Sequence, residues 1–378
     1  MYIESVALQN FRNYESLELG FSDRTNILYG DNAQGKTNVL EAAYVGATTR
    51  SHRMARDKDM IRFGEEEAHI RLNVKKRDVG HRIDMHLRRN KGKVVNIDGI
   101  PIRRSSELFG LINIIFFSPE DLSIIKDGPG ERRRFMDMEL CQLSRIYYSN
   151  LAGYNKVLNQ RNNLLRSMAY QKGLEETLDV WDEQLIQYGK RIITERQNFI
   201  NMLREVVLRV HGKITGGRES IEIRYEPNVT AEDFADTLRK KRDVDLRNNA
   251  TMTGPQRDDI GIYIEDNDVR VYGSQGQQRT AALTLKLAEI DLVRSMISDQ
   301  PILLLDDVMS ELDGKRRNAL LEGIQDIQTI ITCTGYDDFI RERIRMDRIY
   351  RVVRGEIENM GDPVKEDPEQ LVQTEEKE

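Results

Sequence analysis

The chain has 378 residues, of which 39% are hydrophobic and 32% are charged, and its formal net charge is −6. This apolar content is sufficient for a substantial core, and the length suggests two structural units. No run approaches the roughly 18 to 20 apolar residues of a membrane-spanning helix, and no basic and then apolar signal segment opens the chain. Cys141 and Cys333 show no disulfide-framework or zinc-ligand spacing. We expect a cytoplasmic protein that does not associate with membranes.

The negative charge is concentrated at the end of the chain. From Glu356 to Glu378 there are nine acidic residues and two lysines, a net charge of −7 within the total of −6, which leaves +1 for the rest. The segment contains Pro363 and Pro368 and few large apolar residues, so it cannot bury enough surface to offset the entropy of ordering. We expect residues 356–378 to form an acidic mobile tail.

The first part of the chain predicts strands followed by a helix. Tyr2–Asn10 and Glu15–Phe21 alternate apolar and polar residues, and Thr25–Tyr29 is a short apolar run. Thr37–Thr48 contains good helix formers and several alanines, which allow a helix to pack closely on a sheet. Alternation returns from His69 to Ile102, where turn residues predict a meander of antiparallel strands.

The segment between the third strand and the first helix reads Gly30-Asp31-Asn32-Ala33-Gln34-Gly35-Lys36-Thr37. Glycines at these positions permit backbone angles that direct N–H groups at phosphate oxygens. Lys36 can bridge the terminal phosphates, and the Thr37 hydroxyl can ligate Mg²⁺. The pattern arises by chance in roughly one chain of this length in a hundred. We therefore predict that this P-loop binds ATP, with Lys36 also acting in catalysis.

The middle of the chain contains two apolar series with spacings of four and three residues. The first runs from Tyr147 to Met168 and is interrupted by Arg161; the second runs from Leu174 to Val210. They predict two helices joined near Gln171–Gly173 in an antiparallel hairpin, the longer helix about 55 Å long. The hairpin either projects as an arm from a nucleotide-binding head or forms an insertion that packs only on itself.

Two acidic residues follow a short apolar run near the end of the chain. Ile302–Leu305 predicts a buried strand that delivers Asp306 and Asp307 to the carboxyl edge of a sheet. Asp306 would hold Mg²⁺, and Asp307 could position and deprotonate the attacking water. The pair alone does not distinguish this role from an ordinary strand end.

A second anion site is predicted at Gly273–Arg279, before the strongly helical Thr280–Ile297. Ser274 and Gly276 at a helix N-terminus offer free N–H groups and a favourable helix dipole to a phosphate. An ordinary helix cap is the alternative, but the P-loop and the acidic strand favour the phosphate interpretation. One head cannot easily bring both anion sites to one ATP, whereas a dimer that sandwiches two nucleotides can.

The order of these motifs around a helical insertion resembles the ABC-type ATPase heads of the SMC and Rad50 class. The P-loop, Ser274–Gln277, the acidic strand and the loop Ser310–Asp313 carry this resemblance. Within the class the chain is similar to the bacterial RecF family from residue 1 to about residue 355. The segments that carry this closer similarity are Leu8–Tyr14, the P-loop, Phe117–Leu122 and Arg132–Phe135.

The resemblance implies an α/β fold, an ABC-type P-loop ATPase head of mixed β-sheets with flanking helices plus an inserted α-helical hairpin domain. The head would comprise residues 1–118 and 215–355, and the arm residues 119–214. It implies an ATP-dependent DNA-binding homodimer that works with RecO and RecR to load recombinase at single-strand gaps, with roles in replication and the SOS response.

The resemblance also assigns roles to individual residues. Lys36 matches the phosphate position, Thr37 and Asp306 the Mg²⁺ ligands. Asp307 matches the acidic residue that acts as catalytic base, and Arg12 an arginine beside the phosphates. The signature that contacts the partner's ATP is matched by Ser274, Gly276 and Gln277. Ser118 and Glu120 are the nearest candidates for a glutamine loop.

Two departures from the general ABC pattern predict slow hydrolysis. Asp307 stands where transporters usually carry glutamate, and Thr332-Cys333-Thr334 stands where a switch histidine is usual. A shorter base and a missing γ-phosphate sensor should weaken hydrolysis more than binding. We expect a weak, DNA-stimulated ATPase that acts as a switch.

Two other functions and the site of DNA contact stay open at this point. An ATPase subunit of an ABC transporter shares the motifs but normally has the histidine and lacks a heptad hairpin; an SMC-like tether would need a far longer hairpin. Basic clusters either contact the DNA backbone, with little sequence preference, or are ordinary solvated surface. These clusters are Arg50 with Arg53, Arg132–Arg134, Arg239–Arg242 and Arg316-Arg317.

Overall fold

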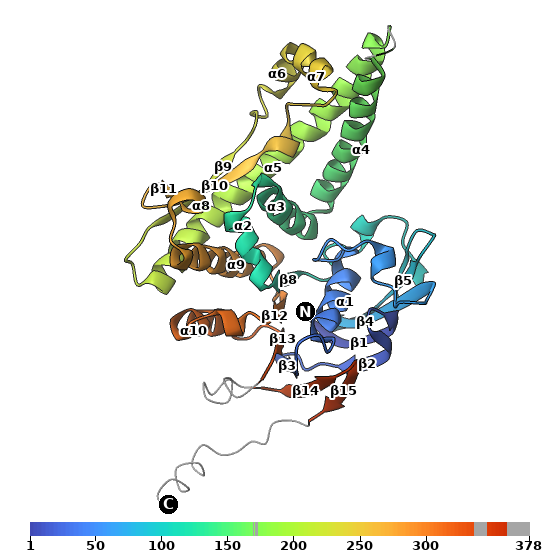
Figure 1. The fold of residues 1–378 in the computed structure, drawn as a ribbon, viewed down its shortest axis with the longest axis vertical. Coiled ribbons are helices and arrows are strands. Elements are labelled where there is room, and N and C mark those ends of the chain that lie inside the picture. Colours follow the sequence, from blue (N-terminus) through green and yellow to red (C-terminus); the bar gives the residue numbers. More distant parts are fainter. Residues whose placement is uncertain (169, 171–172, 336–345, 361–378) are drawn as a thin grey trace, which may run out of the picture.

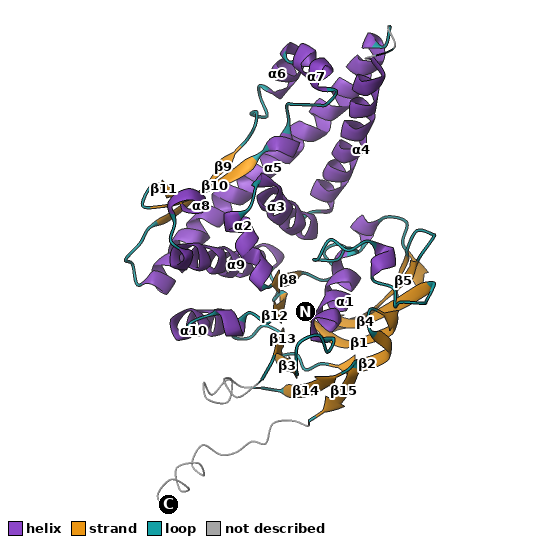
Figure 2. Cartoon of the chain, in the orientation of Figure 1, coloured by secondary structure: helices purple, strands orange, loops and turns teal. Residues whose placement is uncertain are grey.

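The computed structural model describes residues 1–168, 170, 173–335 and 346–360 (Figure 1). Two six-stranded sheets and a pair of long projecting helices dominate this part of the chain (Figure 2). None of the described helices is both long and apolar enough to cross a membrane. Cys141 and Cys333 are both buried.

The first sheet is antiparallel, and it includes the segment from His69 to Ile102 that was predicted to form an antiparallel meander. Its strands lie in the order β2 (Tyr14–Gly20), β1 (Tyr2–Phe11), β4 (Glu67–Lys76), β5 (Val79–Arg88), β6 (Val94–Ile97) and β7 (Ile100–Pro101). Along β4 every second residue from Ala68 to Val74 is buried, so the alternation in the sequence gives the sheet one apolar face. The predicted strands and meander are confirmed.

The second sheet is mainly parallel. Its order is β15 (Glu356–Asn359), β14 (Arg348–Val353), β3 (Thr25–Tyr29), β13 (Thr329–Cys333), β12 (Ile302–Asp306) and β8 (Ile114–Phe117). All residues of β8, β12 and β13 are buried, as expected for parallel strands that are covered on both faces. Only β15 is antiparallel to its neighbour.

Helix α1 (Lys36–Thr48) follows the P-loop and contacts strands of both sheets. Eleven of its 13 residues are buried, which explains the alanines on several sides of the helix. At Gly46 the helix packs so closely on β4 that a Cβ atom would lie 2.4 Å from Leu72 Cδ1. Helix α1 is therefore clamped between the sheets, and the P-loop at its start is held with it.

The predicted helical hairpin consists of α4 (Arg145–Met168) and α5 (Glu175–Thr215). The 41 residues of α5 extend over about 60 Å at 1.5 Å per residue. The connection predicted at Gln171–Gly173 lies mostly outside the described residues. The hairpin does not pack only on itself, because α5 also contacts α9 (Gln275–Ile297) and β9 (Ile221–Glu226).

Further elements are attached to the arm. The remaining elements are α2 (Ser123–Lys126), α3 (Pro129–Leu143), α6 (Phe234–Lys240), α7 (Arg242–Asn248), β10 (Asp259–Ile264), β11 (Asn267–Asp268), α8 (Val269–Tyr272) and α10 (Gly314–Gly323). Strands β9, β10 and β11 form a sheet of their own, α6 contacts α5, and α7 contacts α4. We therefore propose to count residues 221–268 with the arm, although the sequence placed them in the head.

The predicted start of the acidic tail at Glu356 is wrong. Residues Glu356–Asn359 form β15, which pairs with β14 through a turn at Arg354 and Gly355. A count of charges cannot detect this pairing, because alternate residues of an edge strand are free to be acidic. Residues 361–378 lie outside the described part of the chain.

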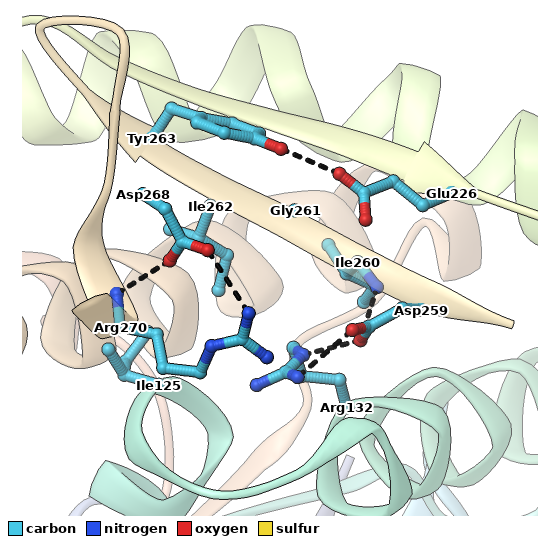
Figure 3. Close-up of a pocket in the computed structure, with 10 residues that line it drawn as sticks. All are labelled: Ile125, Arg132, Glu226, Asp259, Ile260, Gly261, Ile262, Tyr263, Asp268 and Arg270. Carbon is cyan, nitrogen blue, oxygen red and sulfur yellow. Dashed lines mark hydrogen bonds and ion pairs between the residues drawn. The ribbon is translucent and has the colours of Figure 1, made fainter.

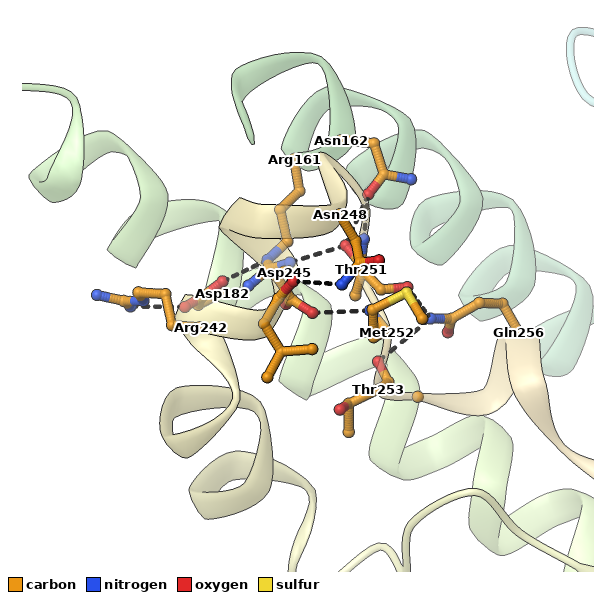
Figure 4. Close-up of polar contacts among 12 residues, drawn as sticks. Arg161, Asn162, Asp182, Arg242, Asp245, Asn248, Thr251, Met252, Thr253 and Gln256 are labelled. Carbon is orange, nitrogen blue, oxygen red and sulfur yellow. Dashed lines mark hydrogen bonds and ion pairs between the residues drawn. The ribbon is translucent and has the colours of Figure 1, made fainter. Parts of the chain in front are cut away.

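Arg161, which interrupts the heptad pattern, lies in a buried ion-pair network (Figure 4). Its Nε donates to Asp182 on α5 at 2.6 Å, and its NH1 donates to Asp245 on α7 at 2.7 Å. The side chains of both acids are at most 3% exposed. One guanidinium thus joins α4, α5 and α7. Because Arg161 lies within the apolar face of α4, its need for acidic partners determines which helices pack there.

Replacing Arg161 by alanine should reduce the stability by about 3–5 kcal/mol, because two carboxylates would remain buried without their cation. Arg166→Ala on the same helix is the matched control, since Arg166 is exposed and should change stability by less than about 0.5 kcal/mol. Denaturant unfolding followed by circular dichroism measures both. Equal stability of the two variants would contradict the structural role of Arg161.

Candidate nucleotide-binding site

The P-loop joins β3 to α1, and its two glycines are required by the geometry. Gly30 has φ +151°, and a Cβ atom there would lie 2.3 Å from the carbonyl oxygen of Val352. Gly35 has φ +115°, and a Cβ atom would lie 2.5 Å from Asn13 Nδ2. Neither position accepts a side chain.

Lys36 folds inward over this loop. Its ammonium donates to the carbonyl oxygens of Gly30 at 2.6 Å and Asp31 at 2.8 Å. Burial lowers the pKa of Lys36, and the nearby Asp307 opposes part of that shift. The ammonium therefore lies within the loop, where phosphate oxygens would replace two backbone carbonyls as its acceptors.

Two other segments brace the loop from outside. Gln34 accepts a hydrogen bond from Arg354 N at its side-chain oxygen, at 2.5 Å, and one from Gly355 N at its carbonyl oxygen, at 3.1 Å. The turn between β1 and β2 acts from another direction, because the Tyr14 hydroxyl donates to the Gly35 carbonyl oxygen at 3.1 Å. The exposed Asp31, Asn32 and Ala33 form the tip of the loop.

Asp306 lies at the end of β12, where Thr37 and Thr332 both donate to its Oδ1 atom at 2.7 Å. Burial raises the pKa of Asp306, and the two hydroxyl donors oppose that shift. The hydroxyl of Thr37 beside a carboxylate provides hard oxygen donors of the type that Mg²⁺ prefers. The predicted pair of metal ligands is therefore together, and its chemistry fits the ion.

Thr332 has a role that the sequence did not reveal. The sequence showed only that the segment around Thr332 lacks a switch histidine. In the structure its hydroxyl donates to Asp306 and accepts a hydrogen bond from Asp307 N at 3.1 Å. It therefore orients both acids from β13, and only the pairing of β13 with β12 makes this visible.

Asp307 has a left-handed backbone conformation with φ +54°, which aspartate tolerates better than most residues. Its backbone N–H donates to the Thr332 hydroxyl, and its carbonyl oxygen accepts a hydrogen bond from the Ser310 hydroxyl at 2.8 Å. Asp307 is half-buried, and the charge of its carboxylate raises the pKa of Lys36 against the lowering effect of burial. Among the weaker influences on the pKa of Asp306, the charge of Arg53 lowers it and the charge of Glu120 raises it.

Arg12 lies in the turn between β1 and β2, but its guanidinium is occupied within the protein. It forms two bonds of 2.7 Å with the carboxylate of Glu41 on α1, and it donates to the Asp59 carbonyl oxygen at 2.7 Å. Burial raises the pKa of Glu41, but the bonds from Arg12 and Ser51 outweigh it, so the pKa is below its usual value. A glutamate within a helical pattern gave no sign of this role. Contact between Arg12 and phosphate stays a prediction.

The predicted second anion site lies at the N-terminus of α9. Ser274 Oγ accepts from Gln277 N at 3.2 Å, and Gln277 Oε1 accepts from Ser274 N at 3.0 Å. The helix cap that was the alternative interpretation is therefore present. Ser274 and Gly276 are exposed and line a hollow of about 540 Å³. The residues of the P-loop and the acid pair are not among those that line it, so one chain does not join the two sites.

The basic cluster Arg132–Arg134 is engaged in internal contacts. Arg132 is buried and pairs with Asp259 at 2.6 Å (Figure 3). Arg133 and Arg134 donate to the carbonyl oxygens of Asp258 and His52. Both interpretations of the cluster Arg132–Arg134, DNA contact and solvated surface, are therefore wrong for Arg132, because this buried side chain fixes α3 against β10.

The exposed Arg50 lies in a different environment. It lines a groove of about 760 Å³ that also includes Lys93, Arg133 and Arg134. Residues from the end of α1 form one wall, and residues from α3 and α4 form the other. The acidic Asp57, Glu131 and Asp137 also line the groove, so its charge is mixed.

A P-loop between β3 and α1, an acid pair at the end of β12 in the same sheet and an inserted helical hairpin define an ABC-type ATPase head. The sequence profile of the RecF/RecN/SMC N terminal domain family matches residues 2–358. The chain therefore belongs to this family and, as its relatives show, to the RecF proteins within it. The predicted fold class and resemblance are confirmed.

The relatives cover nearly the whole chain. The chain is 58% identical over 358 residues to the DNA replication and repair protein RecF of Lachnoclostridium phytofermentans, covering 95% of this chain and 99% of that protein. Identity to the RecF of Agathobacter rectalis is 56% over 358 residues, with the same coverage. A solved structure of the recombination mediator protein RecF with ATP is 34% identical with a TM-score of 0.89, covering 95% of this chain and 98% of that chain.

Replacing Asp306 by asparagine should stabilise the nucleotide-free protein and remove Mg²⁺-dependent hydrolysis. The raised pKa of Asp306 means that folding favours the neutral acid. That contribution to stability is present below the ordinary aspartate pKa of about 3.9 and is lost as the pH rises through the raised pKa. The melting temperature of Asp306→Asn should exceed that of the wild type at neutral pH, and the difference should shrink toward about pH 4. An unchanged or lower value at neutral pH would contradict this.

Proposed function

We propose that this protein is an ATP-dependent DNA-binding protein of recombinational repair that forms a homodimer on binding ATP. In the cytoplasm it would help RecO and RecR to load recombinase at single-strand gaps, with roles in replication and SOS induction. Its membership of the RecF family supports this proposal. The observation that carries the dimer is the separation of two anion sites, the P-loop and the α9 N-terminus, which have no lining residues in common.

In the proposed dimer each ATP lies between two heads. The P-loop N–H groups and Lys36 hold the phosphates from one side, and Ser274, Gly276 and Gln277 of the second copy approach the terminal phosphate from the other. Helix α9 begins at Gln275, so its dipole favours that negative charge. ATP then contributes contacts to both copies, which is why its binding would favour the dimer.

The chain's own residues supply the hydrolytic step. Thr37 and Asp306 would hold Mg²⁺, which neutralises charge on the phosphates when it is bound. Asp307 orients a water molecule and takes its proton as the water oxygen attacks the terminal phosphorus and ADP leaves. Thr332 supplies a hydroxyl to Asp306 where a histidine would sense the phosphate. Slow hydrolysis follows from the short acid and the absence of that imidazole, and we propose that DNA binding stimulates it.

DNA contact is proposed for the groove that contains Arg50, Lys93, Arg133 and Arg134. The exposed Arg50 can neutralise a backbone phosphate, whereas Lys93, Arg133 and Arg134 would have to exchange partners within the protein for phosphates. Binding should weaken steeply with salt and depend little on sequence. The groove lies between the head and the arm, which would allow DNA to sense their relative position. An ABC-transporter subunit is not favoured, because the chain is 58% and 56% identical to two RecF proteins over 95% of its length.

Two variants should separate ATP binding from dimerisation. Lys36→Ala should abolish ATP binding, because it removes the cation of the P-loop. Ser274→Arg should retain ATP binding but remain monomeric, because a bulky cation would occupy the exposed face of the second site. Light scattering with and without ATP, repeated with gapped duplex DNA, measures both. If Ser274→Arg dimerised normally, the sandwich arrangement would be excluded.

Asp307→Asn should bind ATP and accumulate as an ATP-bound dimer, because the base is removed while the phosphate contacts remain. Hydrolysis should fall by at least about a hundredfold, the usual contribution of a positioned base. Phosphate release and light scattering on the same sample test this. An unchanged hydrolysis rate would remove Asp307 from the role of base.

A further inference from the structure

The side chain of Arg316 connects the two parts of the site that the proposed function assigns to different nucleotides. Arg316 lies in the first turn of α10, directly after the loop that follows the acid pair. Its guanidinium reaches back to the first turn of α9, where Ser274–Gln277 would contact the ATP of the second copy. The sequence left open whether the cluster Arg316-Arg317 contacts DNA or is ordinary solvated surface.

All three guanidinium nitrogens of Arg316 are used inside the protein. NH2 donates to the Gly276 carbonyl oxygen at 2.9 Å and to Thr280 Oγ1 at 2.8 Å, and Nε donates to Thr280 Oγ1 at 3.1 Å. NH1 donates to the carboxylate of Asp313. The side chain is only 20% exposed. Arg316 therefore connects α9 to the loop before α10 through hydrogen bonds, and its donors are not directed at solvent.

Asp313 is fixed at the same point by a second bond. Its Oδ1 accepts from Arg316 N at 3.0 Å and caps α10, while its Oδ2 receives the guanidinium. Thr280 completes the arrangement, because its hydroxyl donates to the Gly276 carbonyl oxygen at 2.8 Å. The carbonyl of Gly276 thus has two donors, so the backbone next to Ser274 and Gln277 is defined by Arg316 and Thr280 together.

The other end of the loop is tied to Asp307, the proposed catalytic base. Ser310 donates to the carbonyl oxygen of Asp307 at 2.8 Å. Between these ends Glu311 pairs with Arg279 of α9 at 3.3 Å. A continuous series of polar contacts therefore runs from Asp307 through the loop to the α9 N-terminus of the same chain. A shift of Asp307 on binding or hydrolysis of ATP has a mechanical route to the second anion site.

We propose that Arg316 is a positioning residue that keeps the first turn of α9 in register with the loop Asp307–Asp313. Through it the nucleotide state of one copy sets the position of the Ser274–Gln277 loop on the ATP of the other copy. This inference rests on the proposed ATP sandwich. Arginine suits the role because its planar fork reaches Gly276, Thr280 and Asp313 at once, whereas the single ammonium of lysine cannot bond all three in this geometry.

The test compares the wild type with Arg316→Gln, Arg316→Lys and the charge-matched control Arg239→Ala, whose side chain is exposed on α6. ATP affinity is measured with a fluorescent ATP analogue, and the dimer dissociation constant by light scattering with ATP and without DNA. Hydrogen exchange of a peptide spanning residues 274–283 is followed without nucleotide. Thermal unfolding confirms that each variant is folded.

Arg316→Gln should bind ATP within about twofold of the wild type, because the P-loop is untouched, but its dimer should be weaker by about tenfold or more, the effect of losing charged hydrogen bonds. Exchange in the 274–283 peptide should accelerate without nucleotide. Arg316→Lys should recover only part of the dimer affinity, and Arg239→Ala should match the wild type.

The outcomes separate this inference from the proposed function. If the wild type did not dimerise with ATP, the proposed sandwich would fail and this inference with it. If the wild type dimerised and Arg316→Gln dimerised equally well, only the role of Arg316 would be overturned. Full recovery by Arg316→Lys would also overturn it, because charge without the fork would then suffice.

Discussion

The parallel pairing of β3, β13 and β12 is the constraint on which the site depends. Leu28 of β3 lies opposite Thr332 of β13, and Thr332 lies opposite Asp306 of β12. A strand near the start of the chain and two strands more than 270 residues later thus end at the same edge of one sheet. The P-loop, the hydroxyl of Thr332 and the acid pair meet there because the parallel register aligns the carboxyl ends of the three strands.

Buried charge, in addition to apolar packing, determines how the arm is assembled. Arg161 joins α4, α5 and α7, and Arg196 lies in a similar buried position with Asp137 and Asp258. Such pairs add little net stability compared with well-packed apolar side chains, but a misplaced partner leaves an uncompensated charge. They therefore favour one arrangement of the helices over others that would bury similar apolar area.

The sequence predicted those features that depend on local pattern. Period-two and heptad patterns located the strands and the hairpin, and the P-loop and Asp306 were identified from chemical type and spacing. Glu41, Thr332 and the contacts of Arg132 were not predictable, because each depends on a partner brought near by the tertiary fold. Strand β15 was missed for the same reason, since its pairing with β14 does not show in its acidic composition. A charged residue such as Arg132 resembles a surface residue in the sequence when its ion-pair partner, here Asp259, is distant along the chain.

The contact between the β14–β15 turn and Gln34 has a consequence for the entropy of ligand binding. A phosphate-binding loop that is free in the absence of ligand must lose its conformational freedom when the ligand arrives, and this loss weakens binding. Here Arg354 and Gly355, more than three hundred residues from Gln34, already restrain the loop. Most of that ordering therefore takes place when the chain folds, and the last described strands of the chain help to set the affinity of a loop near its beginning.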